Sequence, residues 1–253
     1  MFRASPKGFV VLRAGSGGAL RRAERVEYPG ERASGQAEGP ASYSSCMFTG
    51  LIQHKGRIRE ARPGRSSTRL VVDGDGWSIV PAAGDSIAVN GVCLTLAELG
   101  PGHVFHFDVV PETLRVTTLG LLGPGAEVNL ESSVTASSLM GGHIVQGHVD
   151  GVASVIGVVD SGEYRVRLEV PGDLMPFMVP KGSVTVEGVS LTLAGVDPEA
   201  EAIEVALIPV TLRATTLGLL KEGDRVNLEC DVIARTVVHY LRHYGRGDGN
   251  IRF

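Results

Sequence analysis

The sequence predicts an all-β protein made of two tandem small domains, each a barrel or a sandwich, followed by one helix. Three observations support this prediction: an internal repeat with a period near 97 residues, short β-type segments within each repeat, and an amphipathic stripe close to the end of the chain. The chain has 253 residues, which allows two domains of about 100–125 residues each.

Residues 1–46 differ from the rest of the chain. They hold seven Lys and Arg against four Glu, they are rich in Gly, Ser, Ala and Arg, and they lack a sustained period of 2 or 3.6 residues. This composition predicts disorder. Two interpretations stay open: an extension upstream of a start at Met47, or a targeting segment, because residues 1–23 contain five basic and no acidic side chains.

The rest of the chain contains two copies of one pattern. Fifteen of 21 positions are identical between residues 111–131 and residues 209–229, and residues 84–95 correspond to residues 181–192 at an offset of 97. The repeat is too long for a solenoid and has the length of a domain. We therefore place a disordered extension, a first domain, a second domain and a C-terminal helix with its tail at residues 1–46, 47–140, 141–234 and 235–253.

Each copy carries strand and turn signals. The β-branched or alternating segments are residues 86–89, 104–109, 165–170 and 183–186. The dipeptides Asn90-Gly91 and Glu187-Gly188 each predict a hairpin turn, and a short helix is expected after Pro111 and again after Pro209. Such short strands are typical of a small barrel or sandwich, and barrel closure would remove exposed sheet edges.

The segment from Asp231 to Tyr244 has helical periodicity. Its apolar residues Ile233, Val237, Leu241 and Tyr244 are spaced 4, 4 and 3 apart, which gives one stripe of an amphipathic helix. Asp231 is a suitable N-cap, and Gly245 ends the pattern. The stripe either docks on its own barrel or pairs with copies of itself in an oligomer, and we favour the oligomer.

The composition excludes several classes of protein. The formal net charge is −4, and residues 47–253 carry 17 basic against 24 acidic side chains, which argues against a nucleic-acid binder held by phosphate contacts. Cys46, Cys93 and Cys230 have no regular spacing, so neither a disulfide framework nor a metal site is predicted. No apolar run approaches the ~18–20 residues that span a membrane, and we expect a reducing, cytoplasmic compartment.

The two copies differ at positions suited to chemistry. Cys93 in the first copy corresponds to Ser190 in the second, and both follow a tight turn. Cys93 is either a buried small hydrophobe or a thiol that faces a ligand. Thr95 and Thr192 lie two residues further on, hence on the same strand face. Two polar side chains on one face in both copies indicate the lining of a pocket rather than core.

Several separate motifs resemble riboflavin synthase of the lumazine-dismutating, double-barrel type. They are Met47-Phe48-Thr49-Gly50, the paired segments 90–95 and 188–192, Gly141-Gly142-His143 with Gly147-His148, and the doubled Pro-x-Thr-Leu-x-x-Thr-Thr-Leu-Gly. The resemblance covers residues 47 to about 244 and favours Met47 as the start. It implies two tandem six-stranded Greek-key barrels with a C-terminal α-helix.

The resemblance also implies an activity. In this family a transferase exchanges a four-carbon unit between two molecules of 6,7-dimethyl-8-ribityllumazine and gives riboflavin and 5-amino-6-ribitylamino-uracil, with no cofactor and no metal. Each barrel binds one lumazine, and the working site forms between the first barrel of one subunit and the second barrel of its neighbour in a homotrimer. An association with lumazine synthase stays open.

The resemblance carries two sets of residues onto this chain. The polar residues usually discussed for catalysis match Ser86, Cys93, His148, Lys181 and Asp231. Substrate contacts of the first barrel match Gly50, Leu51, Ile52, Cys93, Leu94, Thr95, Asp108, Val109, Val110, Pro111, Glu112 and Thr113. Those of the second barrel match Gly147, His148, Val149, Lys181, Ser190, Leu191, Thr192, Ile208, Pro209, Val210, Thr211, Leu212 and Arg213. One departure is Val210, where the family often has Glu.

Structural roles remain open for some of these residues. Lys181 could be a solvated turn residue, His148 a strand histidine and Asp231 a helix cap, while Gly50 and Gly147 could serve a bulge. Two other functions compete with the enzyme. A non-catalytic lumazine- or flavin-binding protein of the same fold would tend to lose the polar residues, which are retained here. An oligonucleotide-binding barrel needs a basic, aromatic-lined groove, which the composition does not favour.

Overall fold

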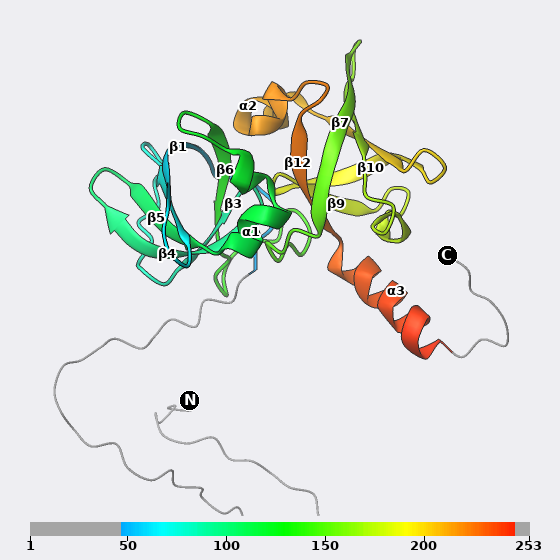
Figure 1. The fold of residues 1–253 in the computed structure, drawn as a ribbon. Helices are drawn as coiled ribbons and strands as arrows, with labels where there is room; N and C mark the ends of the chain where they lie inside the picture. Colours follow the sequence, from blue (N-terminus) through cyan, green and yellow to red (C-terminus); the bar gives the residue numbers. More distant parts are fainter. Residues whose placement is uncertain (1–46, 246–253) are drawn as a thin grey trace, which may run out of the picture. The chain divides into compact units, whose positions relative to one another are not determined.

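The computed structural model describes residues 47–245 and shows two closed, six-stranded antiparallel barrels followed by a helix (Figure 1). The all-β prediction is therefore confirmed, and closure of both sheets selects the barrel over the sandwich. The predictions made for residues 1–46 lie outside the described residues.

The two barrels have the same strand order. The first consists of β1 (His54–Pro63), β2 (Thr68–Asp73), β3 (Ser86–Val89), β4 (Val92–Gly100), β5 (Val104–Val109) and β6 (Glu127–Ser132). The second consists of β7 (Gly151–Asp160), β8 (Tyr164–Glu169), β9 (Ser183–Val186), β10 (Val189–Asp197), β11 (Ala202–Leu207) and β12 (Arg225–Cys230). The rings run β1-β2-β5-β4-β3-β6 and β7-β8-β11-β10-β9-β12, so the sequence repeat is a repeat of topology.

The repeat extends to the irregularities of the strands. The pairing of β1 with β2 shifts between Ile58 and Glu60, and that of β7 with β8 shifts between Val155 and Gly157. Matching shifts occur in β4 and β10. Bulges bend a strand and increase its twist, which helps six short strands close around a core. Phe105 and Phe107 are fully buried in the first core, and β-branched and Leu side chains dominate the second.

A short helix begins at Pro111 after β5 and another at Pro209 after β11, as predicted. The helical elements are α1 (Pro111–Val116), η1 (Thr118–Leu121), η2 (Met175–Phe177), α2 (Pro209–Ala214), η3 (Thr216–Leu219) and α3 (Val232–Tyr244). Proline stands at the start of α1 and α2, where its fixed φ suits a helix and its missing N–H costs nothing. The Thr117 and Thr215 side chains then cap η1 and η3 by accepting from backbone N–H groups.

The C-terminal helix α3 begins at Val232, three residues before the division placed at 235 from the sequence. Asp231 caps it, because the carboxylate accepts a 2.8 Å hydrogen bond from the Ile233 N–H. Gly245 ends the helix by donating to the carbonyls of Tyr240 and Leu241. Both ends of the helix therefore match the sequence prediction.

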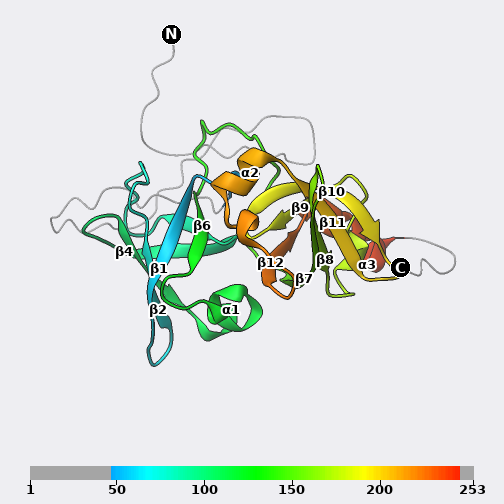
Figure 2. The same cartoon turned by 90° about the horizontal axis from the view of Figure 1, so that it is seen from above.

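The apolar stripe of α3 is exposed in the single chain. Ile233, Val237 and Tyr244 are 61%, 52% and 65% exposed, whereas Val238 is buried. The helix contacts η2 of the second barrel, and Figure 2 shows it beside that barrel. The contact with its own chain thus leaves the predicted stripe uncovered.

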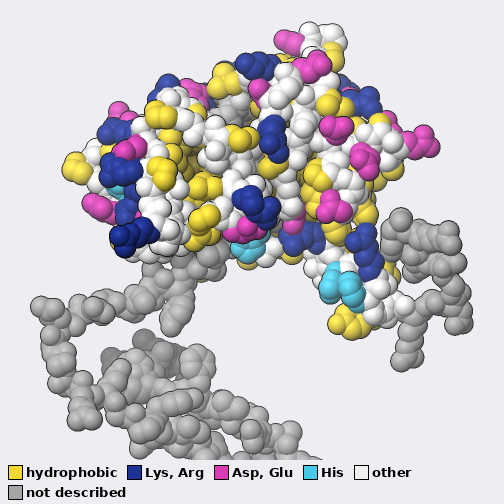
Figure 3. All heavy atoms as spheres, viewed as in Figure 1, with side chains coloured by type: hydrophobic (Ala, Val, Ile, Leu, Met, Phe, Trp, Pro, Cys, Tyr) yellow, Lys and Arg dark blue, Asp and Glu magenta, His cyan; other side chains and the backbone are white. Residues whose placement is uncertain are grey.

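Charged side chains of both signs are interspersed over the barrels (Figure 3). Several form ion pairs, such as Arg59 with Asp73 at 2.8 Å and Arg167 with Asp197 at 3.0 Å. Exposed pairs of this kind contribute little to stability. Among residues 47–245, no helix is long and apolar enough to cross a membrane.

The hairpin turns of β3–β4 and β9–β10 meet between the barrels. Asn90, Gly91, Glu187 and Gly188 all have positive φ, between 48° and 81°, as a two-residue hairpin turn of this type requires. A Cβ on Gly91 would lie 2.7 Å from the Gly188 nitrogen, so the close approach of the two turns requires glycine. The sequence predicted both turns but not their contact.

Candidate functional site

The segments that precede each barrel are exchanged between the barrels. We call residues 48–52 the first arm and residues 145–149 the second arm. Phe48 and Val145 pair as an antiparallel bridge, with N···O distances of 2.7 and 3.1 Å. Beyond this bridge, each arm crosses to the barrel encoded by the other repeat.

The first arm contacts the second barrel. The Ser190 N–H of β10 donates to the Gly50 carbonyl at 2.8 Å, and Ile52 packs against the second core. The second arm mirrors this arrangement, because the Cys93 N–H of β4 donates to the Gly147 carbonyl at 2.8 Å and Val149 packs against the first core. The resemblance placed Gly50 with Cys93, and Gly147 with Ser190, as substrate contacts of the same barrel. In the fold, exchange of the arms instead brings Gly50 to Ser190 and Gly147 to Cys93.

Gly50 and Gly147 permit this exchange. Both have φ near +74°, a left-handed conformation that favours glycine. A Cβ on Gly50 would lie 2.6 Å from the Ser190 Cβ, and one on Gly147 would lie 2.6 Å from the Cys93 Cβ. Each glycine therefore serves the close approach of an arm to a strand rather than a bulge.

Two surfaces result, and each combines both barrels. The first surface joins Cys93 and Thr95 of β4 with the second arm. Ser86 belongs to it by register, since it pairs with Thr95 across β3 and β4. Cys93 is half-buried and Thr95 is exposed, whereas the Ser86 side chain is buried. His148 of the second arm is exposed.

The second surface joins Ser190 and Thr192 of β10 with the first arm. Ser190 is half-buried and Thr192 exposed, which repeats the pattern of the first surface. Lys181 lies in the turn before β9 with φ of 63° and donates its N–H to the Leu193 carbonyl at 3.2 Å. Its side chain is exposed. This exposure is compatible both with a solvated turn residue and with a residue that contacts a ligand.

Exposed apolar side chains lie at the positions expected to contact substrate. Leu51, Val110, Ile208 and Val210 are each about half exposed or more. They come from the first arm and from the segments that enter α1 and α2. Exposed apolar groups at these positions are available to contact a ligand. The remaining positions of the segments 108–113 and 208–213 fall at the end of β5 and in the two short helices α1 and α2.

His143 distinguishes the second surface, and sequence analysis named it only as part of a motif. Its Nδ1 lies 2.7 Å from the Ser190 Oγ, and its Nε2 lies 3.2 Å from the Thr185 Oγ1. Burial lowers the pKa of the imidazole, while the nearby charge of Asp231 acts in the opposite direction. Ser190 therefore has an imidazole partner, and Asp231 both caps α3 and acts on that imidazole.

Two buried glutamates, which the sequence analysis did not single out, hold the arms. Glu131 of β6 accepts hydrogen bonds from the first arm, and Glu229 of β12 accepts from the second. They are the last residues of the repeated Val-Asn-Leu-Glu. A charged residue that recurs at the same place in both copies was the available signal.

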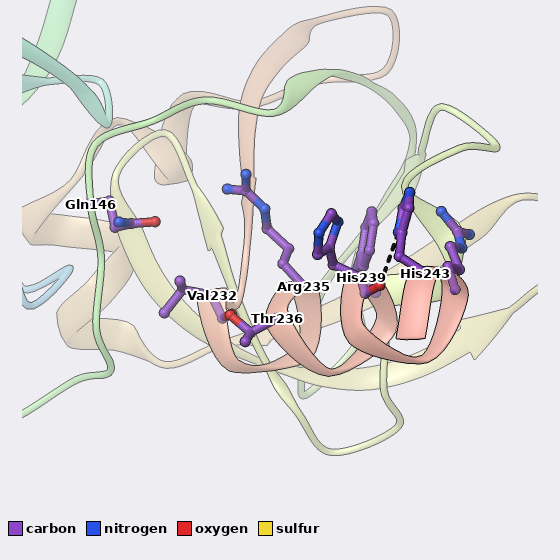
Figure 4. Close-up of a pocket in the computed structure, with 8 residues that line it drawn as sticks. Gln146, Val232, Arg235, Thr236, His239 and His243 are labelled. Carbon is purple, nitrogen blue, oxygen red and sulfur yellow. Dashed lines mark hydrogen bonds between the residues drawn. The ribbon is translucent and has the colours of Figure 1, made fainter. Parts of the chain in front are cut away.

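A pocket of about 390 Å³ lies between α3 and η2, and Gln146 of the second arm belongs to its lining. It is lined by Gln146, Phe177, Val232, Arg235, Thr236, His239, Arg242 and His243 (Figure 4). Arg235 pairs with Asp150 at 3.0 Å, and the guanidinium of Arg242 lies 5.7 Å from the Phe177 ring centre. Its cations thus already have partners within the chain.

Within residues 47–245, no three His, Cys, Asp or Glu side chains gather as metal ligands. Cys230 is buried, and burial raises the pKa of its thiol, which disfavours the thiolate that binds metals or attacks electrophiles. Among the two described cysteines, Cys93 is the more accessible to a ligand.

Comparison with known proteins agrees with this geometry. The family model for the lumazine binding domain matches residues 49–133 and 146–231. Riboflavin synthase of Mycobacterium tuberculosis (strain H37Rv) is 43% identical over 201 residues, which cover 79% of this chain and all of that protein. Riboflavin synthase of Bacillus subtilis (strain 168) is 37% identical over 196 residues, 77% of this chain and 90% of that protein.

Solved structures show the same fold. LumP complexed with 6,7-dimethyl-8-(1'-D-ribityl) lumazine superimposes with a TM-score of 0.62 at 25% identity, over 72% of this chain and 98% of LumP. LumP complexed with riboflavin gives a TM-score of 0.63 at 26% identity over the same shares. With two lumazine-binding domains and extensive identity to curated enzymes, the chain belongs to the riboflavin synthase family of transferases.

Proposed function

We propose that this enzyme dismutates 6,7-dimethyl-8-ribityllumazine, passing a four-carbon unit from one molecule to another to give riboflavin and 5-amino-6-ribitylamino-uracil. One observation carries the proposal: the chain builds two related but unequal surfaces, each from a strand of one barrel and the arm of the other repeat. Two like substrates need two similar sites, and a donor and an acceptor need sites that differ.

The reaction fits a protein that supplies positioning and acid–base help. The 7-methyl group of the lumazine is acidic and its C7 is electrophilic, so carbon–carbon bond formation can begin on the heterocycle itself. The atoms of two lumazines equal those of the two products, so no oxidant or reductant is consumed. Holding two reactants together lowers the entropic part of the barrier, and positioned side chains can move the protons.

The two surfaces offer different polar groups for this task. The first presents Cys93 with the nearby Ser86, together with His148 from the second arm. The second presents Ser190 with its His143 partner, and Lys181 lies in the turn that precedes β9. We assign binding to the shared features and the donor–acceptor distinction to the groups that differ. Asp231 acts through the cap of α3 and its charge on His143.

The exposed stripe of α3 supports assembly into a homotrimer. Ile233, Val237 and Leu241 face solvent in the single chain, and exposed apolar stripes of helices are buried by association. In such a trimer, the first surface of one subunit would face the second surface of its neighbour. That pairing would bring two lumazines together.

A turnover assay tests the proposal. Purified protein mixed with the lumazine under anaerobic conditions should produce riboflavin, seen as the growth of its visible absorbance, together with the pyrimidine. Tight binding of the lumazine without product would overturn the proposal in favour of a non-catalytic lumazine-binding protein, the function that the likeness to LumP would then suggest.

A further inference from the structure

Glu131 and Glu229 are two buried carboxylates for which the proposed chemistry provides no role. They are 1% and 3% exposed. Burying a carboxylate is costly unless hydrogen bonds compensate it. Their equivalence under the repeat, at an offset of 98 residues, indicates a task that both halves of the molecule share.

The hydrogen bonds of both carboxylates go to the arms. Glu131 Oε1 accepts from the Thr49 N–H at 2.7 Å and from the Thr49 hydroxyl at 2.8 Å, and Oε2 accepts from the Gly50 N–H at 3.0 Å. Glu229 Oε1 accepts from the Gln146 N–H at 2.7 Å, and Oε2 accepts from the Gly147 N–H at 3.0 Å. Each carboxylate therefore accepts hydrogen bonds from two successive backbone amides, one at each of its oxygens.

Each glycine held by a glutamate is itself hydrogen-bonded to a residue of the candidate site. Gly50, held by Glu131, offers its carbonyl to the Ser190 N–H, and Gly147, held by Glu229, offers its carbonyl to the Cys93 N–H, both at 2.8 Å. The glutamates stand on β6 and β12, in register with Ala88 of β3 and Thr185 of β9. Strands β6 and β12 thus hold the two arms at the candidate site through the side chains of Glu131 and Glu229.

We propose that Glu131 and Glu229 are positioning residues that set the geometry of the two lumazine surfaces by holding the first and second arms against Ser190 and Cys93. The substrate named here rests on the proposed function. The arrangement of hydrogen bonds does not depend on it.

Glu229 adds a dependence on pH. Burial raises its pKa to about 7, opposed by hydrogen bonds from the amides of Gln146, Gly147 and His148, and the charge of Asp150 raises it further. The ionised form accepts from all of these amides. A protonated oxygen would turn an O–H toward an N–H, so the second arm is held less firmly below about pH 7.

The charged and titratable groups around Glu229 come from several elements. Asp150 precedes β7 and accepts from the Cys230 N–H, Arg235 of α3 pairs with Asp150, and His143 contacts Thr185, the register partner of Glu229. Asp231 lies two residues along the chain. Glu131 has no comparable acidic neighbour among the causes that shift its pKa, and burial raises that pKa as well.

The test compares Glu131→Gln and Glu229→Gln with Glu127→Gln, a matched control on β6 whose carboxylate is partly exposed and pairs with Arg57. Glutamine keeps the size but places an NH₂ against a backbone N–H, so one hydrogen bond to each arm is lost. Loss of a hydrogen bond to a charged group corresponds to about a tenfold or greater effect. We expect riboflavin to bind about tenfold more weakly to both variants, and the KM for the lumazine to rise.

Two further readouts separate positioning from general stability. In Glu229→Gln the fall in kcat/KM below about pH 7 should disappear, because the titrating group is gone, while Glu131→Gln keeps it. Amide hydrogen exchange at Gly50 should quicken in Glu131→Gln, and exchange at Gly147 in Glu229→Gln. Wild-type affinity, pH profile and exchange in both variants would overturn the proposal.

The outcome does not depend on folding of the variants or on turnover. If a variant fails to fold, exchange at residues 146–148 of the wild-type protein, measured on both sides of pH 7, still decides. The reference is Trp77, whose N–H donates to the Gly74 carbonyl. Faster exchange relative to Trp77 at low pH supports the proposal, and a constant ratio overturns it. If the wild-type protein binds riboflavin but forms no product, the proposed function fails while the binding and exchange measurements still test the two glutamates.

Discussion

Replacing Glu187 by glutamine should stabilise the protein in alkaline solution. Glu187 lies in the turn between β9 and β10, at the contact between the barrels. Its Oε1 accepts from the Asn227 N–H at 2.6 Å and from the Thr118 hydroxyl at 3.3 Å. Burial raises its pKa from 4.5 to about 8. Glutamine has the same shape, can accept both hydrogen bonds and never ionises.

The size of the effect follows from proton linkage. Between about pH 4.5 and pH 8 the folded protein holds a proton on Glu187 that the unfolded chain releases. Stability therefore falls as pH rises through this window, by about 1.4 kcal/mol per pH unit, and levels off above it. From pH 5.5 to pH 8.5 the wild-type protein should lose about 3 kcal/mol more free energy of unfolding than Glu187→Gln.

Urea denaturation at these two pH values measures the difference. Other buried acids, such as Glu229, titrate in both proteins and cancel in the comparison. Glu222→Gln, at an exposed position, is the matched control and should follow the wild-type pH dependence. Equal pH dependence in wild type and Glu187→Gln would refute the reasoning, since it would mean that Glu187 is ionised at little cost in the folded protein.

Three further predictions concern the arms, the helix and the unequal surfaces. Gly147→Ala should destabilise by about 1–3 kcal/mol in urea titration and weaken riboflavin binding, because its Cβ would meet Cys93, whereas Gly123→Ala, with open space around it, should not; an unaffected Gly147→Ala would contradict the close approach. Leu241→Asp places a charge in the α3 stripe, so sedimentation should show smaller species and the activity should fall, unlike Val80→Asp at an exposed position. An intact assembly would show that the α3 stripe does not hold the subunits together. His148→Ala should lower kcat more than it raises KM, and Cys93→Ser should keep binding and lose part of the rate; wild-type kcat in both would end this assignment of roles.

The fold was largely predictable because the repeat supplied an internal comparison. Strands with β-branched residues, turn dipeptides with glycine and prolines at helix starts are local signals, and the turns and prolines recur at offsets of 97 and 98 residues. The apolar stripe of α3 and the N-cap at Asp231 were also predictable, because helical periodicity and capping depend on residues that are close in the sequence.

The exchange of the arms could not be read from the sequence. Gly50 is 43 residues from Cys93 in the chain and Gly147 is 43 residues from Ser190, so sequence distance does not show that each glycine contacts the strand of the other repeat. The repeat makes both pairings equally compatible with the pattern. Only the contacts across the barrels, such as that of Gly50 with Ser190, decide between them.

The buried polar residues were hidden for a different reason. Glu131, Glu229 and Glu187 look like solvated surface charges in a sequence, because most glutamates are exposed. Their partners are backbone amides of distant segments or, for Glu187, Thr118 of the other barrel. Such partners leave no charge pattern in the sequence. Asn90 stands in the first repeat where Glu187 stands in the second. Glu187 accepts from the Thr118 hydroxyl, whereas the Thr216 hydroxyl, the counterpart of Thr118, is buried in the described chain without a hydrogen-bond partner.

The transfer of a four-carbon unit between two lumazines can be tested with isotopes. The protein is given an equal mixture of unlabelled lumazine and lumazine labelled with ¹³C in both methyl groups, C6 and C7. If two molecules react together at the paired surfaces, about half of the riboflavin formed should carry one labelled and one unlabelled four-carbon unit by mass spectrometry, and the pyrimidine should carry no label. Riboflavin without this mixed species, or no riboflavin at all, would contradict the account.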